Sequence, residues 1–100
     1  MMGDMLMFKD WIQLLKKLIR DDYQTNNLIC PECGEKSIDY MYVGDNQTNV
    51  GYLPIWCENC NKGIRISRVI VPEGVKRIDI SDMSIIGEKI PDYQEIYPND

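Results

Sequence analysis

The four cysteines of this chain occur as two Cys-x-x-Cys pairs, and 23 residues separate the pairs. The first pair is Cys30 and Cys33, and the second pair is Cys57 and Cys60. Two such pairs at this separation are typical of a tetrahedral metal site in which all four ligands are thiolates, with zinc as the favoured metal. The sequence therefore predicts one structural Zn²⁺ per chain, held by these four residues.

The residues around each pair suit the tight turns that such a site needs. Pro31 presets the backbone angle φ near the start of the first turn, and Gly34 can take a positive φ where the chain doubles back. Asn61, which follows the second pair, tolerates the same left-handed conformation. A site closed by four sulfurs leaves no open position for water or substrate, so it is structural and not catalytic. We therefore predict no catalytic residues.

Three other roles for the cysteines stay open. Two disulfides would suit a secreted chain, but the N-terminal stretch lacks the uninterrupted apolar run of a signal peptide. A redox-active Cys-x-x-Cys normally stands alone at the start of a helix, whereas these two pairs lie among strand-like segments. Iron is the minor alternative to zinc, because four thiolates also suit rubredoxin-like sites.

The size and charge of the chain limit what it can do. One hundred residues suggest a single domain with appendages, for which a bound metal can replace a large core. Four thiolates add −4 and Zn²⁺ adds +2, which takes the formal charge from −5 to −7 and opposes phosphate binding. Histidine, the commonest general base, is absent. No apolar run is long enough to span a bilayer, and we expect a cytoplasmic protein. Because the site is closed and histidine is absent, we also expect that the protein is not an enzyme.

The first expected element is an amphipathic helix over residues 8–20. Its apolar residues recur at steps of three and four, which places them on one face. They are Phe8, Trp11, Ile12, Leu15, Leu18 and Ile19. Residues 1–7 are expected to fray, and the polar run 24–27 to form a linker. Because a short isolated helix is marginal in water, this face must be buried, and we expect it to contact a protein partner or a second copy of the chain.

Strands are expected between and after the cysteine pairs. Residues 37–43 alternate in polarity, and 50–56 and 64–71 follow as further strands, which together predict a three-stranded antiparallel sheet. Pro54 lacks a backbone N–H, so its strand should lie at an edge or contain a bulge there. Residues 75–80 suggest a short fourth strand. Gly87, Pro91 and Pro98 indicate an irregular tail over residues 81–100.

The order turn, hairpin, turn and strand resembles a zinc ribbon, and the resemblance covers residues 28–71. The segments 42–45, 51–57 and 63–69 are also similar to a group of small uncharacterised bacterial zinc-ribbon proteins. The resemblance implies a structural zinc but no activity. Transcript-cleavage elongation factors carry adjacent acids at the hairpin tip, where this chain has only Asp45.

The expected fold is thus a small metal-stabilised α+β protein in three parts. An N-terminal helix occupies residues 1–24, a zinc ribbon residues 25–72, and an irregular C-terminal extension residues 73–100. We expect a protein-interaction or adaptor module.

The alternative is a nucleic-acid-binding ribbon in transcription or its regulation. Residues 62–77 carry five basic residues against Glu73 and so have a net charge of +4. Aromatic side chains could supply stacking surfaces for bases. The candidates are Tyr40, Tyr42, Tyr52 and Trp56.

Overall fold

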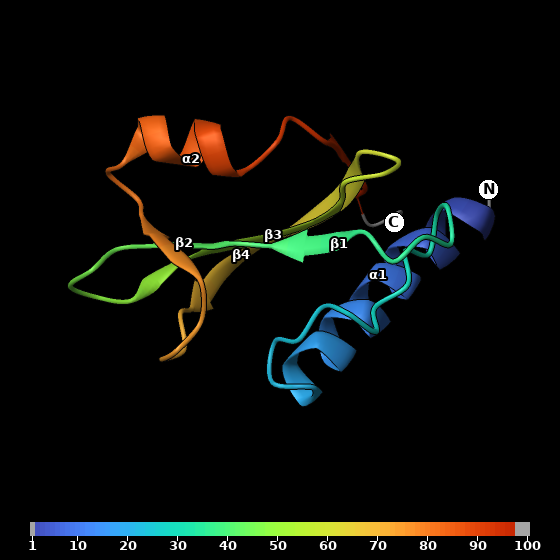
Figure 1. Ribbon diagram of the computed structural model, residues 1–100, viewed down its shortest axis with the longest axis horizontal. Coiled ribbons are helices and arrows are strands. Elements are labelled where there is room, and N and C mark those ends of the chain that lie inside the picture. Colours follow the sequence, from blue (N-terminus) through green and yellow to red (C-terminus); the bar gives the residue numbers. More distant parts are fainter. Residues whose placement is uncertain (1, 98–100) are drawn as a thin grey trace.

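The computed structural model describes residues 2–97, with side chains from residue 8 onward. In this part of the chain six strands form one mixed sheet with a helix on each side (Figure 1). In chain order the elements are α1 (Met2–Arg20), β1 (Ile38–Tyr40), β2 (Tyr42–Gly44), β3 (Val50–Cys57), β4 (Lys62–Ile70), β5 (Arg77–Asp79), α2 (Met83–Lys89) and β6 (Gln94–Glu95). The expected α+β class is confirmed.

The sheet is larger and more varied than the predicted three-stranded antiparallel one. β3 pairs antiparallel with β4 on one side and with both β1 and β2 on the other. The expected fourth strand is present as β5, which pairs parallel with β2, and β6 pairs parallel with β4. Residues 81–97 are therefore not an irregular tail, because they supply α2 and β6. Pro98 lies outside the described residues.

The prediction that Pro54 marks an edge strand or a bulge was wrong, because β3 lies at the centre of the sheet. The Met41 N–H donates to the Pro54 carbonyl at 3.3 Å, so the side of Pro54 that lacks a donor faces the break between β1 and β2. No ladder donor is needed at that break. The bulge lies instead between Gly51 and Tyr52, opposite Arg68, which has a positive φ of 56°.

One face of the sheet carries the hydrophobic core beneath α1. Trp11, Leu14 and Leu18 of the helix are buried there, while Ile19 is 51% exposed. The buried stripe therefore includes Leu14, which was not predicted, and leaves out Ile19, which was. The helix also begins at Met2, so it includes residues 2–7, which were expected to fray. Met1 lies outside the described residues. The sheet contributes Tyr40, Tyr42, Leu53, Ile55 and Ile64 to this core.

A reversal directly after α1 fixes the helix to the sheet. Asp22 and Tyr23 take positive φ values of 57° and 63°, and the Tyr23 N–H donates to the Leu18 carbonyl at 2.8 Å. The Tyr23 ring then contacts the rings of Tyr40 and Tyr42, and its hydroxyl lies 3.0 Å from the Tyr42 hydroxyl. Burial, with help from this hydrogen bond, raises the pKa of Tyr42.

The buried side chains of α1 bear on the expected partner contact through residues 8–20. Trp11 and Leu18 are fully enclosed by their own chain, so they are not a surface for another protein. The structure thus gives no support to a contact through the centre of that face. Within residues 2–97, neither helix combines the length and the apolar character needed to cross a bilayer.

Candidate metal centre

The two cysteine turns bring all four sulfurs to one point. The Sγ atoms of Cys30 and Cys60 lie 3.6 Å apart, as do those of Cys33 and Cys57. All four sulfurs lie within 4.8 Å of one another. A tetrahedral Zn²⁺ site with bonds of about 2.3 Å has sulfur–sulfur edges of about 3.8 Å, whereas a disulfide bond is about 2.05 Å long. The arrangement therefore fits a four-thiolate metal site.

The first turn is closed by hydrogen bonds on both sides of the pair. The Gly34 N–H donates to the Cys30 carbonyl at 2.9 Å, and the Cys30 N–H donates to the Glu35 carbonyl at the same distance. Gly34 has a φ of 80°, as its place at the reversal predicted. The Glu32 N–H points at the Cys30 sulfur from 3.3 Å, where it stabilises a thiolate.

The second turn joins β3 to β4 and repeats this geometry. The Asn61 N–H donates to the Cys57 carbonyl at 2.9 Å, and Asn61 has a positive φ of 60°, as expected. The Glu58 N–H donates to the Ser37 carbonyl at 2.8 Å, which links this turn to the segment that follows the first. The matching turns thus hold two sulfurs each against a common centre.

Two asparagine side chains support the site through hydrogen bonds. The Asn59 side-chain amide donates to the Cys33 sulfur at 3.4 Å. The Asn61 side-chain amide donates to the Asp92 carbonyl at 3.1 Å and so ties the C-terminal extension to the second turn. The position of Asn59 inside the second pair was the only available signal for its role, because an amide there can reach a sulfur of the other pair.

The four thiols differ in how readily they ionise. Cys30 and Cys57 are buried, whereas Cys33 is exposed. Burial raises the pKa of Cys30 to about 12 and also raises that of Cys60. The hydrogen bond from Asn59 is the largest cause that lowers the pKa of Cys33 to about 7. A buried thiolate such as that of Cys30 needs a nearby cation, so binding of a divalent metal would displace protons from this cluster.

An ion pair connects the two turns beside the sulfurs. The Lys62 ammonium lies 3.6 Å from Glu32 Oε1, and the Glu32 side chain is only 6% exposed. The other carboxylate oxygen, Oε2, is buried and has no hydrogen-bond partner among the described residues. Lys62 therefore offsets part of the negative charge that four thiolates and Glu32 would place at this end of the sheet.

Known protein families, curated proteins and solved structures show no match to this chain. The nature of the centre rests on its own geometry. Within the described residues, these four cysteines are the one group of Cys, Asp and Glu side chains that could hold a metal ion. All four ligands predicted from the sequence are in this group.

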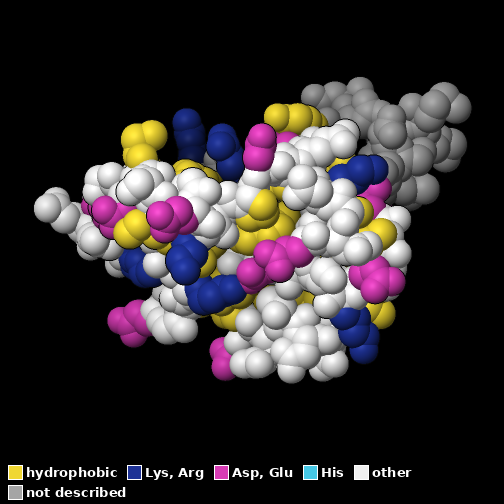
Figure 2. Space-filling model, turned by 45° about the horizontal axis from the view of Figure 1, so that its top comes forward, with side chains coloured by type: hydrophobic (Ala, Val, Ile, Leu, Met, Phe, Trp, Pro, Cys, Tyr) yellow, Lys and Arg dark blue, Asp and Glu magenta, His cyan; other side chains and the backbone are white. Residues whose placement is uncertain are grey.

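Most of the aromatic residues considered as stacking surfaces for nucleic acid are buried. Tyr40, Tyr42 and Trp56 are buried, which leaves only Tyr52 partly accessible, with the Arg65 guanidinium over its ring at 5.0 Å. Lys76 forms an ion pair with Asp39. On the face drawn in Figure 2, Lys and Arg side chains lie among Asp and Glu side chains and do not form one continuous area.

Proposed function

We propose that this chain is a non-enzymatic protein of the zinc-ribbon type, in which a structural Zn²⁺ stabilises the fold and the remaining surface binds another protein. The observation that carries the proposal is the closed cluster of Cys30, Cys33, Cys57 and Cys60. Zinc is favoured because four thiolates in a tetrahedral arrangement are its usual structural ligands. All four positions would be filled by sulfur, so the metal would join the two turns and would not present an open position to a substrate.

The surface that best suits a protein partner lies at the end of β3 and β4 remote from the cysteine turns. Val50 and Ile70 are cross-strand neighbours there, and they are 43% and 67% exposed. A partner that covered these two adjacent side chains would remove apolar surface from water. This pair replaces the apolar face of α1 as the candidate interaction surface.

Nucleic-acid binding remains the second candidate, because Arg65 and Arg68 are exposed on β4. The acidic total charge and the buried aromatic rings disfavour nucleic acid, so we favour the protein partner.

A photo-crosslinking residue at position 70 of the metal-loaded chain, expressed in its native cell, separates the two candidates. The matched control is the same residue at position 35, which is exposed beside the first cysteine turn. We expect discrete protein adducts from position 70 that are absent from position 35. Nucleic-acid adducts, or equal protein labelling from both positions, would contradict the proposal.

A further inference from the structure

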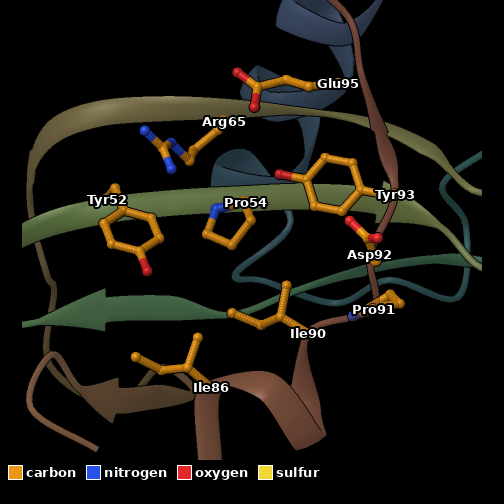
Figure 3. Close-up of a pocket in the computed structure, with 9 residues that line it drawn as sticks. All are labelled: Tyr52, Pro54, Arg65, Ile86, Ile90, Pro91, Asp92, Tyr93 and Glu95. Atoms are coloured by element: carbon orange, nitrogen blue, oxygen red, sulfur yellow. The ribbon is translucent and has the colours of Figure 1, made fainter. Parts of the chain in front are cut away.

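A small cavity lies between α2 with its following segment and the face of the sheet opposite α1 (Figure 3). Its volume is about 210 Å³, below the roughly 300 Å³ at which pockets for drug-sized molecules begin. It therefore suits a small molecule and not a drug-sized one. Nine residues line it: Tyr52, Pro54, Arg65, Ile86, Ile90, Pro91, Asp92, Tyr93 and Glu95.

The apolar part of the cavity is built from both sides. Pro54 of β3 is fully buried and supplies the floor. Ile86 and Ile90 lie four residues apart, and Figure 3 shows both side chains directed toward the sheet. No residue of the range 83–89 is buried, so this helix does not fill the space beneath it. An apolar group placed in this space would gain contacts with the two isoleucines.

The wall formed by Tyr93 is held rigidly. Its ring stacks on Trp56 with centroids 6.1 Å apart and planes inclined by 17°. Its hydroxyl donates to the Ile64 carbonyl at 3.1 Å. One face of the ring and the position of the chain on either side of it are thereby fixed, which places Asp92 and Glu95 at the rim of the cavity.

The rim carries charges of both signs. The Arg65 guanidinium lies over the Tyr52 ring, and it makes no ion pair with another residue of the range 8–97, whose side chains are described. The carboxylates of Asp92 and Glu95 likewise have no ion-pair partner within that range. A simple anion would meet two carboxylates, and a simple cation would meet the guanidinium. A ligand with one charge of each sign is complementary to this rim.

We propose that this cavity binds a free apolar α-amino acid as its zwitterion. Its carboxylate would lie at Arg65, its ammonium group at Asp92, and its side chain against Ile86 and Ile90. Leucine and phenylalanine have the required size. Because Arg65 and Asp92 are exposed, their contacts with the ligand are weakened by water, and the expected affinity is in the millimolar range.

The test is a ¹⁵N chemical-shift titration of the metal-loaded full chain with three matched ligands. L-Phenylalanine has both charges, 3-phenylpropionate lacks the ammonium group and phenethylamine lacks the carboxylate. We expect saturable shifts at Tyr52, Arg65 and Tyr93, with phenylalanine binding about fivefold more tightly than either analogue, since each partly exposed charge contact is worth about 1 kcal/mol. The absence of saturable shifts with phenylalanine, or equal binding of an analogue, would overturn the proposal.

Variants assign the charges independently. Arg65→Gln should weaken phenylalanine about fivefold without weakening phenethylamine, whereas Asp92→Asn should weaken phenylalanine without weakening 3-phenylpropionate. Arg68→Gln is the matched control, because Arg68 is exposed on the same strand and does not line the cavity. Equal loss in Arg65→Gln and Arg68→Gln would show that the total charge matters and not this site, and would also overturn the proposal.

Discussion

The two helices lie on opposite faces of one sheet, and only one of them is held by buried side chains. Trp11 and Leu18 of α1 are fully buried in the core that also contains Cys30 and Cys57. On the other face none of the residues 83–89 of α2 is buried, and Met83 is 77% exposed. The α1 face and the metal centre therefore form one structural unit, while the α2 face keeps a cavity that the fold does not need to fill.

Loss of the metal should have the largest effect on this comparison. Structural zinc contributes on the order of 10 kcal/mol to folding in small zinc domains, which is as much as the whole stability of many domains. We expect Cys57→Ser, or removal of the metal by a chelator, to unfold the α1 face and with it residues 28–71. Circular dichroism melting measures this, with Ser67→Ala on β4 as the control that should melt like the unaltered chain. An unchanged melt for Cys57→Ser would refute the structural role of the centre.

Truncation of one aliphatic side chain on each face makes the comparison quantitative. Leu18→Ala leaves a void in a fully buried site and should cost about 2–5 kcal/mol of unfolding free energy. Ile86→Ala removes a half-buried side chain beside an existing cavity and should cost less than about 1 kcal/mol. Urea unfolding of the metal-loaded variants gives both values. Similar losses in the two variants would mean that α2 contributes as much to the core as α1.

Removal of the Asn59 amide should have a smaller effect, confined to the metal centre. Without this donor the pKa of Cys33 rises from about 7, so protons compete with the metal more strongly near neutral pH. We expect Asn59→Ala to weaken metal binding by about tenfold near neutral pH, and by less at higher pH where the thiol ionises in either case. Competition with a chelator at several pH values measures this. Asn27→Ala, an exposed change in the linker, is the control, and a loss independent of pH would contradict the mechanism.

The metal site could be predicted from the sequence because its determinants are local. The spacing of Cys30 and Cys33, and of Cys57 and Cys60, fixes two sulfurs per turn, and Gly34 and Asn61 have the positive φ values that the turns require. Asn59 was missed because its partner, Cys33, lies 26 residues away. The sequence contains no pattern that distinguishes such an amide from an ordinary turn residue.

The sheet could be predicted only in part because short pairings leave no periodic pattern. β5 and β6 have three and two residues, too few for alternation to identify their partners. Pro54 was placed wrongly because a break in the neighbouring strand, and not the edge of the sheet, meets its missing donor. The helical face was displaced because Leu14 and Ile19 border the stripe of Trp11 and Leu18 on opposite sides, and only contact with the sheet decides between them.

The metal content of the purified chain tests the central claim most directly. Native mass spectrometry should show one Zn²⁺ bound per chain, with four thiols that resist alkylation until the metal is removed. The account also predicts that replacing Cys30 or Cys57 with serine abolishes this bound zinc. A folded chain that carries no metal, or that contains Cys30, Cys33, Cys57 and Cys60 as two disulfides, would contradict it.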